Sequence, residues 1–192
     1  CISDTHGRHR DICLPQGDIL IHAGDITHFG KEHQLLDFNE WLGELPFTHK
    51  VVIAGNHECN NTYDVGKLIT NGVYLDGSST TVEGVKIFGI EFFPDSFAGS
   101  VPAATDIVVS HNPPCNIGDG LNGKASGTGC KLLLREVQQK KPKLHVFGHV
   151  HSGYGLYTFP DTPLSGTTFV NAAICGGPYN YALTNPPIIV DL

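Results

Sequence analysis

Four times in this chain, a short apolar run rich in β-branched residues ends abruptly in glycine, aspartate, asparagine or histidine. Unbroken runs of this length, bounded by turn residues, are typical of strands that are buried on both faces, as in parallel sheets. Open α/β sheets bind ligands at the carboxyl ends of their strands, so the polar residues after the runs are predicted to share one pocket. The runs and their polar ends are "ILIHA" with Gly24 and Asp25, "VVIA" with residues 55–58, "IVVS" with His111 and Asn112, and "LHVF" with residues 148–151.

Helical patterns lie between these runs. Leu35, Leu36 and Trp41 belong to a set of apolar residues at three- and four-residue spacings, which predicts a helix over residues 32–44. The stretch "GTGCKLLLREVQQKKP" predicts a second helix that ends before Pro142. The stretch "TTVEGVKIFGIEFF" predicts a hairpin that turns at residues 83–84, and "TTFVNAAIC" and "PPIIVDL" predict late strands of a second sheet. The glycine-spaced "GDGLNGKASGTG" fits either a lid or an ordinary mobile loop.

The composition favours one compact domain over residues 1–192, because 192 residues with 40% hydrophobic content can bury one core. Only 16% of the residues are charged, while the chain has 23 glycines and 12 prolines, which suits short strands joined by many loops. The formal net charge of −7 argues against non-specific nucleic-acid binding, which depends on a basic surface. An anionic ligand would therefore need local positive charge, and bound metal cations can supply it.

The six cysteines are scattered and form no C-x-x-C pair, so we expect reduced thiols and a cytoplasmic location. The sequence shows no signal peptide and no run near the roughly 18 apolar residues of a membrane-spanning helix, and no membrane partner is predicted. The chain has no methionine and begins at Cys1, so we expect a fragment or processed chain whose first strand is truncated. The sequence indicates no oligomeric state.

Eleven histidines make any single histidine weak evidence for a site, and a lone H-x-H in a loop is more often an exposed pair than a set of ligands. His9, His22, His33, His49 and His145 are interpreted as structural or surface residues. Together with the N-terminal "SDTHG", however, the strand ends offer two carboxylates, one carboxamide and four imidazoles. These candidate metal ligands are Asp4, His6, Asp25, Asn56, His111, His149 and His151.

Imidazole and carboxylate ligands without thiolate suit manganese, iron, zinc or cobalt better than calcium or a cysteine-type structural zinc site. Seven protein ligands are too many for one transition-metal ion. A pair of ions about 3.5–4 Å apart, bridged by one carboxylate, would use all seven and leave room for water. The predicted cofactors are therefore two divalent transition-metal ions (Mn, Fe or Zn), and no organic cofactor is predicted.

Five ordered motifs between Asp4 and His151, "DTH", "GDITH", "GNHE", "SHN" and "GHVH", resemble the signature motifs of the calcineurin-like metallophosphoesterases. The stretches "HAGDITHFG", "KPKLHVFGHVHSGYG" and "NPPIIVDL" look like the small metallophosphoesterase-domain-containing subgroup, which is similar to class III cyclic nucleotide phosphodiesterases. The resemblance implies an α/β fold, a four-layer α/β/β/α sandwich of two mixed sheets flanked by helices.

The same resemblance implies a role for each residue of the motifs. Asp4, His6 and His151 would hold one metal, Asn56, His111 and His149 would hold the other, and Asp25 would bridge both. His57 corresponds to the family's catalytic histidine, which stabilises the transition state or protonates the leaving oxygen, and Glu58 is given a structural role. Many members carry an acidic residue three positions after the bridging aspartate, where this chain has His28. His28 is thus a second candidate catalytic residue, which could contact the substrate phosphate, or an ordinary loop residue.

The implied reaction is phosphoester hydrolysis, in which two metals lower the pKa of a bridging water and the resulting hydroxide attacks phosphorus in line. We expect a small phosphoester substrate, with phosphodiesters favoured and cyclic nucleotides first. Phe29, Phe92, Phe93 and Tyr154 are candidates for stacking on a base, although core or surface packing is the commoner role of such residues. The alternatives are a protein or small-molecule phosphomonoesterase and a non-catalytic nucleotide-binding or scaffold member. Retention of His57 and all seven ligands favours an enzyme.

Overall fold

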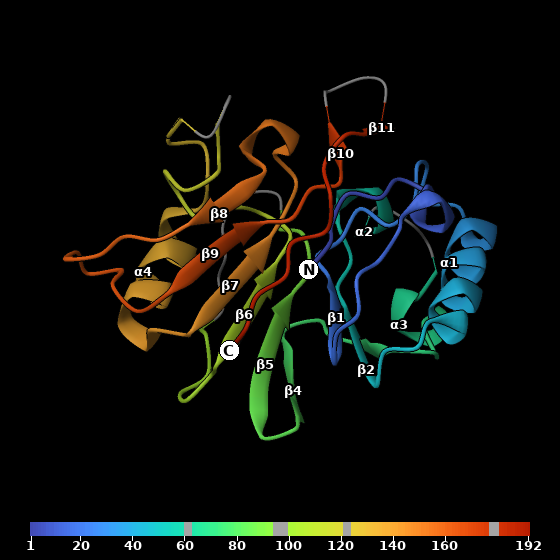
Figure 1. Ribbon diagram of the computed structural model, residues 1–192, viewed down its shortest axis with the longest axis horizontal. Helices are drawn as coiled ribbons and strands as arrows, with labels where there is room; N and C mark the ends of the chain where they lie inside the picture. The colour runs from blue at the N-terminus through green and yellow to red at the C-terminus, as the bar shows by residue number, and fades with distance from the viewer. Residues whose placement is uncertain (60–62, 94–99, 121–123, 177–180) are drawn as a thin grey trace.

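In a computed structural model of residues 1–192, the described residues are 1–59, 63–93, 100–120, 124–176 and 181–192. They form two larger β-sheets that lie face to face, with helices on both outer sides, and a third sheet of two strands (Figure 1). One of the two larger sheets has three strands and the other has six. This is the four-layer α/β/β/α arrangement predicted from the sequence.

The elements of this arrangement are short. The strands are β1 (Ile19–His22), β2 (His49–Val52), β3 (Val73–Tyr74), β4 (Ser78–Val82), β5 (Val85–Ile90), β6 (Ile107–Ser110), β7 (Leu144–Phe147), β8 (Gly155–Tyr157), β9 (Thr168–Asn171), β10 (Cys175–Gly176) and β11 (Ala182–Leu183). The helices are α1 (Glu32–Glu44), α2 (Asn56–Cys59), α3 (Val65–Leu68) and α4 (Lys131–Lys140), with 3-10 turns η1 (His9–Asp11) and η3 (His151–Gly153).

The two longer helices agree with the sequence prediction. Helix α1 spans Glu32–Glu44 and buries Leu35, Phe38, Trp41 and Leu42. Leu36 is 48% exposed, because the buried stripe of three- and four-residue steps runs through Phe38 instead. Helix α4 begins after Cys130, whose sulfur accepts a hydrogen bond from Leu133 N at 3.4 Å. Among the described helices, none is long and apolar enough to cross a membrane.

Most pairings within the sheets are parallel. Strand β2 pairs in parallel with β1 and β3, and the neighbours β5-β6, β6-β7 and β7-β9 are also parallel. The antiparallel pairs are β4-β5 and β8-β9 at the two edges of the larger sheet. The β4-β5 hairpin turns at residues 83–84, as predicted, since Val82 pairs with Val85.

Three apolar clusters separate the four layers, because alternate residues of each strand face opposite sides. Between the sheets lie Ile21, Val51, Ile107, Val109, Val146 and their neighbours. Between the smaller sheet and helices α1 and α3 lie Leu20, Leu35, Phe38, Val52, Val65 and others. Between the larger sheet and α4 lie Val108, Leu133, Val137, Phe147 and Phe169. Burial on both faces explains why the central strands read as unbroken apolar runs.

The predicted strand "TTFVNAAIC" is divided between the two sheets. Its first part is β9, whereas Ala173 forms an isolated parallel bridge with Ser3, and Ile2 forms another with His22 of β1. Strand β10 then pairs with β11 in antiparallel fashion. The chain thus passes from the larger sheet to the edge of the smaller one, where residues 2 and 3 pair through single bridges.

The prediction of a strand in "PPIIVDL" is wrong. Residues 186–192 run as irregular chain, and Ile188 exchanges two backbone hydrogen bonds with Cys1, at 2.8 and 3.1 Å. Pro186 and Pro187 have no N–H group to donate, which prevents a continuous ladder. The side chains of Ile188 and Val190 still pack against the cluster between the sheets.

Candidate metal centre

The polar residues that follow β1, β2, β6 and β7 lie together at the end of the sheets where helix α2 sits (Figure 1). The N-terminal segment joins them, since Asp4 N and His6 N donate to the carbonyls of Gly24 and Asp25 at 2.9 and 3.1 Å. All seven predicted ligands are in this cluster, in two groups with Asp25 between them. The first ligand group is Asp4, His6 and His151, and the second ligand group is Asn56, His111 and His149.

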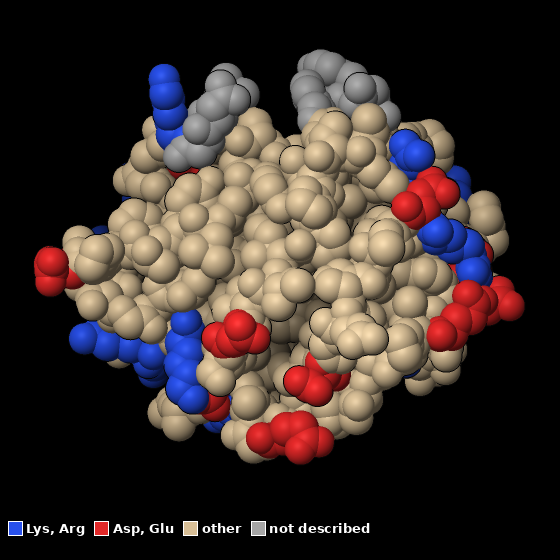
Figure 2. Space-filling view, viewed as in Figure 1, with Lys and Arg blue, Asp and Glu red and all other residues tan. Residues whose placement is uncertain are grey.

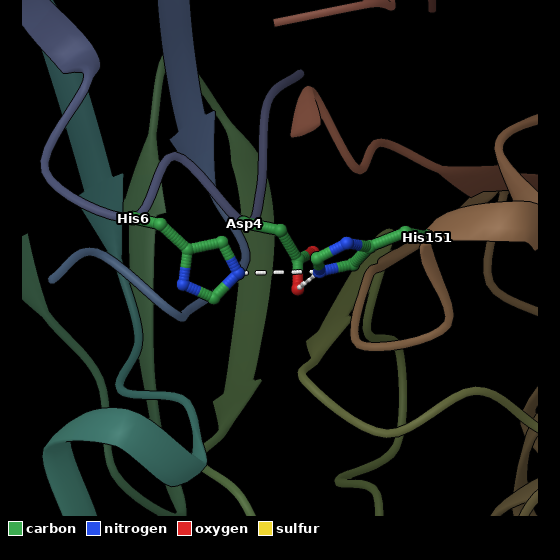
Figure 3. A group of neighbouring side chains, drawn as sticks. All are labelled: Asp4, His6 and His151. Carbon is green, nitrogen blue, oxygen red and sulfur yellow. Dashed lines mark hydrogen bonds and ion pairs between the residues drawn. The ribbon is translucent and has the colours of Figure 1, made fainter. Parts of the chain in front are cut away.

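In the first ligand group, nitrogen and oxygen atoms converge at short distances (Figure 3). His151 Nε2 lies 3.2 Å from Asp4 Oδ1, and it also lies 3.2 Å from His6 Nε2. One ligand atom from each of the three residues lies within 4.8 Å of the others. Such a set of two imidazoles and one carboxylate can hold one metal ion.

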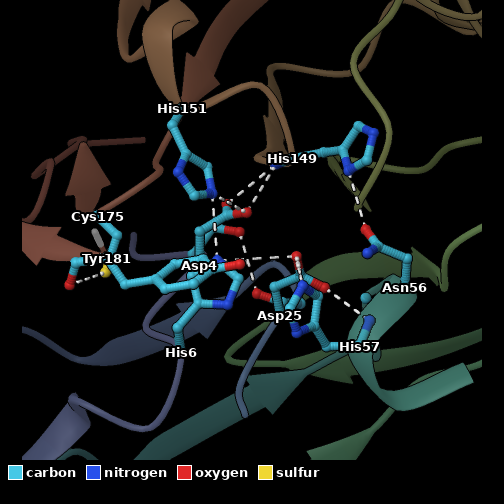
Figure 4. A network of polar contacts seen from close by, with 12 residues as sticks. Asp4, His6, Asp25, Asn56, His57, His149, His151, Cys175 and Tyr181 are labelled. Atoms are coloured by element: carbon cyan, nitrogen blue, oxygen red, sulfur yellow. Dashed lines mark hydrogen bonds and ion pairs between the residues drawn. The ribbon is translucent and has the colours of Figure 1, made fainter. Parts of the chain in front are cut away.

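In the second ligand group, the carboxamide of Asn56 lies between two imidazoles. Asn56 Oδ1 is 3.1 Å from His111 Nε2 and 3.0 Å from His149 Nδ1 (Figure 4). The two histidines of the H-x-H pair thus face different groups through different nitrogens, His149 through Nδ1 and His151 through Nε2.

Asp25 faces both groups with separate oxygens. Its Oδ1 lies 3.4 Å from His111 Nε2, and its Oδ2 lies 3.9 Å from His6 Nε2. The carboxylate is almost completely buried, at 3% exposure. This is the arrangement that a carboxylate bridging two ions requires.

Backbone carbonyls fix the orientation of two of these imidazoles. His111 Nδ1 lies 2.8 Å from Ala23 O, and His6 Nδ1 lies 3.4 Å from Thr27 O. Because a carbonyl can only accept, Nδ1 of each ring carries a proton, and in the neutral form of the ring the lone pair of Nε2 is directed into the site. Carbonyl partners of this kind are usual behind metal-binding histidines.

Four of the seven candidate ligands adopt a left-handed backbone conformation that is unfavourable for residues with a side chain. The φ angles are 53° for Asp4, 45° for His6, 51° for Asp25 and 67° for His149. Conformations of this kind cost on the order of 1–3 kcal/mol each and cluster at functional sites. Their concentration here indicates that the fold holds these side chains in place at the expense of stability.

Two glycines allow the ligand loops to approach one another. A Cβ atom on Gly148, just before His149, would lie 2.1 Å from Asp4 Oδ2. A Cβ atom on Gly55, just before Asn56, would lie 2.2 Å from Asp25 N and from Asp25 Oδ1. No side chain fits at such distances, so the glycines of "GNHE" and "GHVH" are needed for close packing of the loops.

The cluster shifts the pKa values of its histidines in opposite directions. Burial disfavours the charged form of His111, but the Asp25 carboxylate, together with Asp4 and the Ala23 carbonyl, outweighs burial and raises the pKa of His111 to about 9. Burial lowers the pKa of His6 to about 4, against the attraction of Asp4 and Asp25. In the metal-free protein, His111 is therefore protonated at neutral pH and His6 is neutral. A cation that binds the second ligand group must displace the proton of His111.

His57, the predicted catalytic histidine, lies beside the first ligand group. Its Nδ1 is 2.7 Å from the carbonyl oxygen of His28, and its Nε2 is 3.8 Å from Asp25 Oδ2. The backbone N–H of His57 donates to Asp25 Oδ1 at 3.0 Å. This hydrogen bond between His57 and His28 uses the backbone of His28, while the His28 imidazole lies against Phe29 and Tyr181.

Glu58 joins the loop that carries Asp25 to the turn that carries Asn56. Its Oε1 accepts hydrogen bonds from the N–H and hydroxyl of Thr27, at 2.9 and 2.7 Å, and its Oε2 accepts one from Gly55 N at 2.9 Å. Burial, assisted by the charge of Asp25, raises the pKa of the Glu58 carboxyl. This geometry agrees with the structural role expected for Glu58.

The predicted stacking residues are distributed around the site. The ring of Phe92 lies 5.6 Å from the ring of His149, and Phe92 and Phe93 line a cavity of about 460 Å³ beside it. Phe29 is 67% exposed, with its ring 3.9 Å from that of His28. Tyr154 instead donates its hydroxyl to Pro186 O at 2.9 Å.

The loop "GDGLNGKASGTG" borders this cavity through Thr128 and Gly129. Residues 121–123 lie outside the described residues. On either side of them, Asp119 accepts hydrogen bonds from the backbone N–H groups of Asn116, Ser126 and Gly129, at 2.8–2.9 Å.

One aromatic residue at the site, Tyr181, was not predicted from the sequence. Its ring centroid lies 4.1 Å from that of His6 and 4.6 Å from that of His28. Tyr181 belongs to a segment rich in glycine, proline and asparagine, which has no periodic pattern and no recognisable motif. Only the return of the chain to the edge of the smaller sheet brings this residue to the site.

Residues 1–153 match the family described as calcineurin-like phosphoesterase. The chain belongs to this family, and the protein is a metal-dependent phosphoester hydrolase. It is 37% identical to metallophosphoesterase domain-containing protein 1 of Homo sapiens over 234 residues, which cover 100% of this chain and 70% of the human protein. It is 36% identical to UPF0046 protein C25E10.12 of Caenorhabditis elegans over 230 residues, which cover 100% of this chain and 79% of the nematode protein. The similarity to the human protein confirms the subgroup that the motifs predicted for this chain.

A solved structure supports the assignment of the fold. The crystal structure of TT1561 of Thermus thermophilus superposes with a TM-score of 0.58 over 88% of this chain and 86% of that chain. The two sequences are only 13% identical, so this likeness concerns the fold alone.

Proposed function

We propose that the protein hydrolyses phosphodiesters, cyclic nucleotides first, with two divalent transition-metal ions (Mn, Fe or Zn) as cofactors. The observation that carries this proposal is the position of Asp25, whose two oxygens face different ligand groups. Asp4, His6 and His151 would hold one ion, Asn56, His111 and His149 the other, and Asp25 both. When bound, the ions would supply an activated water and neutralise charge on the phosphoryl oxygens.

The ligand atoms of the site fit this kind of ion. They are imidazole nitrogens and carboxylate or carboxamide oxygens, a mixture that suits Mn, Fe and Zn. Cys175 lies close by, but burial raises the pKa of its thiol to about 12, and its sulfur donates to the carbonyls of Thr5 and Tyr181. A protonated thiol is a poor metal ligand. The centre therefore offers nitrogen and oxygen and no thiolate from Cys175.

His57 is suited to act on the leaving group. Its Nδ1 donates to a fixed backbone carbonyl, so the ring is held with Nε2 toward Asp25 and the first ligand group. From this position Nε2 can hold a proton and deliver it to the oxygen that leaves phosphorus. The backbone N–H of His57 also orients Asp25.

The cavity beside His149 supports a diester rather than a monoester substrate. Its volume of about 460 Å³ is within the range of small-molecule sites. Aromatic and apolar groups line much of it, together with the start of helix α4 and one cation, Lys131. An acyclic phosphodiester carries two separate organic groups, and this cavity gives the second group a place while the first lies near His57.

The distribution of charge also supports a small substrate. On the face shown in Figure 2, the charged side chains lie mainly toward the rim, and the centre carries few of them. Non-specific nucleic-acid binding requires a basic surface, whereas the net charge of this chain is −7. Positive charge from the bound cations would then attract the phosphoester.

The proposal is tested by metal analysis combined with a panel of substrates: bis(p-nitrophenyl) phosphate, p-nitrophenyl phosphate and 3′,5′-cyclic AMP. We expect two ions per chain at saturating manganese and a higher kcat/KM for diesters than for the monoester. Asp25→Asn should weaken both sites and abolish turnover. Asp64→Asn is the matched control, because Asp64 is an exposed residue whose carboxylate lies 3.3 Å from Lys67 Nζ. Preference for the monoester would indicate a phosphomonoesterase, and two bound ions without hydrolysis would indicate a scaffold.

A further inference from the structure

Tyr181 reaches the metal centre from outside the region that defines the family. The family match ends at residue 153, whereas Tyr181 directly precedes strand β11. Its ring centroid lies 4.1 Å from His6, 6.2 Å from His57 and 6.3 Å from His151. Figure 4 shows the tyrosine beside His6, on the side of the site away from Asn56.

The backbone holds Tyr181 in this position against its own preference. Its φ angle is 41°, which is unfavourable for a residue with a side chain. The Tyr181 carbonyl accepts a hydrogen bond from Cys175 Sγ at 3.3 Å, and the next two residues pair with Cys175 and Gly176. A strained residue held through its own carbonyl and through the strand that follows it has a defined ring position, which is what a binding surface needs.

Tyr181 forms an aromatic wall together with His28 and Phe29. The rings of Tyr181 and His28 meet edge to face, with centroids 4.6 Å apart and planes at 82°. The rings of His28 and Phe29 meet in the same way, at 3.9 Å and 82°. Since Phe29 is 67% exposed, the wall runs from the first ligand group out to solvent. A rigid aromatic surface of this kind favours contact with planar groups.

We propose that Tyr181 is a specificity-determining residue, whose ring packs against the leaving group of the substrate on the His57 side of the site. This inference rests on the proposed phosphodiesterase function. The other organic group of the diester lies in the cavity beside His149, next to Phe92. Tyr181 and Phe92 therefore contact different ends of the substrate. The wall selects planar leaving groups, such as an aryl group or a nucleoside.

Two diesters separate these roles. In methyl p-nitrophenyl phosphate only the aryl group can leave, so productive binding puts the aryl group against Tyr181. In bis(p-nitrophenyl) phosphate a second aryl group enters the cavity. Tyr181→Ala should raise KM about tenfold for both substrates, with a smaller change in kcat. Phe92→Ala should raise KM more for the bis ester than for the methyl ester.

Tyr181→Phe keeps the ring and should keep the wild-type KM, and it also covers the case in which Tyr181→Ala fails to fold. Tyr74→Ala removes another half-buried tyrosine, whose hydroxyl donates to Glu91, and is the control for general loss of packing. Metal content is measured for every variant.

If Tyr181 only supports His6, Tyr181→Ala will lose bound metal and kcat equally for both esters, and the proposal is wrong. It is equally wrong if KM is unchanged or if Tyr181→Phe behaves like Tyr181→Ala. A wild-type protein that hydrolyses neither diester would instead overturn the proposed function.

Discussion

At the scale of single residues, His57 and the metal ligands should differ in what they contribute. His57→Ala should leave both ions bound, because the His57 ring is not part of either ligand group. It should lower turnover by about 10²–10⁴-fold, the typical contribution of a well-placed acid. The loss should be largest for poor leaving groups, such as the ribose oxygen of a cyclic nucleotide, and smaller for p-nitrophenolate. Steady-state kinetics on both substrate types, with metal analysis, measures this difference.

His28→Ala is the internal control for that experiment. The acceptor of the His57 Nδ1 proton is the carbonyl of His28, which remains when the side chain is removed. We therefore expect His28→Ala to keep the orientation of His57. Any effect through the aromatic wall should appear in KM, and kcat should not fall more for poor leaving groups than for good ones. Equal losses for good and poor leaving groups in His57→Ala would exclude the acid role of His57. A leaving-group dependence in His28→Ala would show that its imidazole takes part.

His145 makes the stability of the fold sensitive to acid. It is completely buried in β7, and burial lowers the pKa of its imidazole to about 3. Below pH 6.5 the unfolded chain takes up a proton at this residue and the folded chain does not, so the free energy of unfolding falls as the pH falls. The slope is about 1.4 kcal/mol per pH unit. Between pH 7.5 and pH 5.0, His145→Leu should lose about 2 kcal/mol less stability than the wild type.

Urea denaturation of both proteins in a chelator, at the two pH values, measures this difference. His6 and His22, whose pKa values burial lowers to about 4 and about 3, remain in both proteins and cancel in the comparison. Ser110 keeps a hydrogen-bond acceptor in the variant, because its hydroxyl also donates to Asn112 O at 2.8 Å. The same pH dependence in both proteins would mean that His145 is protonated in the folded state.

At the scale of elements, Glu58 holds the β1 loop and the start of α2 together. Glu58→Ala would remove the acceptor of the buried N–H groups of Thr27 and Gly55. An unsatisfied buried donor costs about 1–3 kcal/mol, so the loss of the acceptor for two donors should lower the free energy of unfolding by about 2–6 kcal/mol. Manganese affinity should fall as well, since the loops carry Asp25 and Asn56. Denaturation and metal titration of the variant test both effects.

Glu40→Ala is the matched control, because Glu40 is an exposed residue of α1 whose carboxylate lies 3.7 Å from Arg10. Surface changes of this kind usually alter stability by less than about 0.5 kcal/mol. If Glu58→Ala is no more destabilising than Glu40→Ala, the two loops are held by other contacts.

The central strands and the candidate ligands could be predicted because one sequence pattern, an apolar run followed by polar residues, indicates both. A strand that is buried on both faces needs an unbroken apolar run, and the first polar residues after it mark its carboxyl end. Asp25, Asn56, His111 and His149 all follow such runs directly, so the pattern indicated both their position and their proximity. The structure brings these residues together as expected, while their role as ligands remains a prediction.

The late part of the chain could not be predicted in the same way. "TTFVNAAIC" reads as one strand because every residue in it suits a strand, and nothing in its periodicity marks the passage from one sheet to the other. "PPIIVDL" is apolar enough for a strand, but its prolines leave it without the donors of a ladder. Tyr181 depends on that passage between sheets, and this explains why no local signal identified it.

At the scale of the whole molecule, the two ligand groups connect the two sheets. Asp25 and Asn56 follow strands of the smaller sheet, whereas His111, His149 and His151 follow strands of the larger one. Ions bound here would act only on the folded state and would stabilise it. A concentration 100 times the Kd contributes about 2.7 kcal/mol per ion, which corresponds to a rise in Tm of about 5–10 °C for a chain of this size.

A thermal melt with and without manganese measures that rise. Asp25→Asn should abolish most of it, because this residue faces both ligand groups, and Asp64→Asn should retain it. A wild-type Tm that does not respond to manganese would show that the folded state binds no ion tightly.

The left-handed backbone at Asp4, His6, Asp25 and His149 sets stability against function in this protein. Glycine adopts such a conformation without strain, so at each of these positions the backbone alone would favour glycine over the residue present. A laboratory selection for heat resistance without a requirement for activity would therefore tend to erase the centre, beginning with the exposed His149. A thermostable variant that has glycine at this position would have gained its stability by giving up a candidate metal ligand.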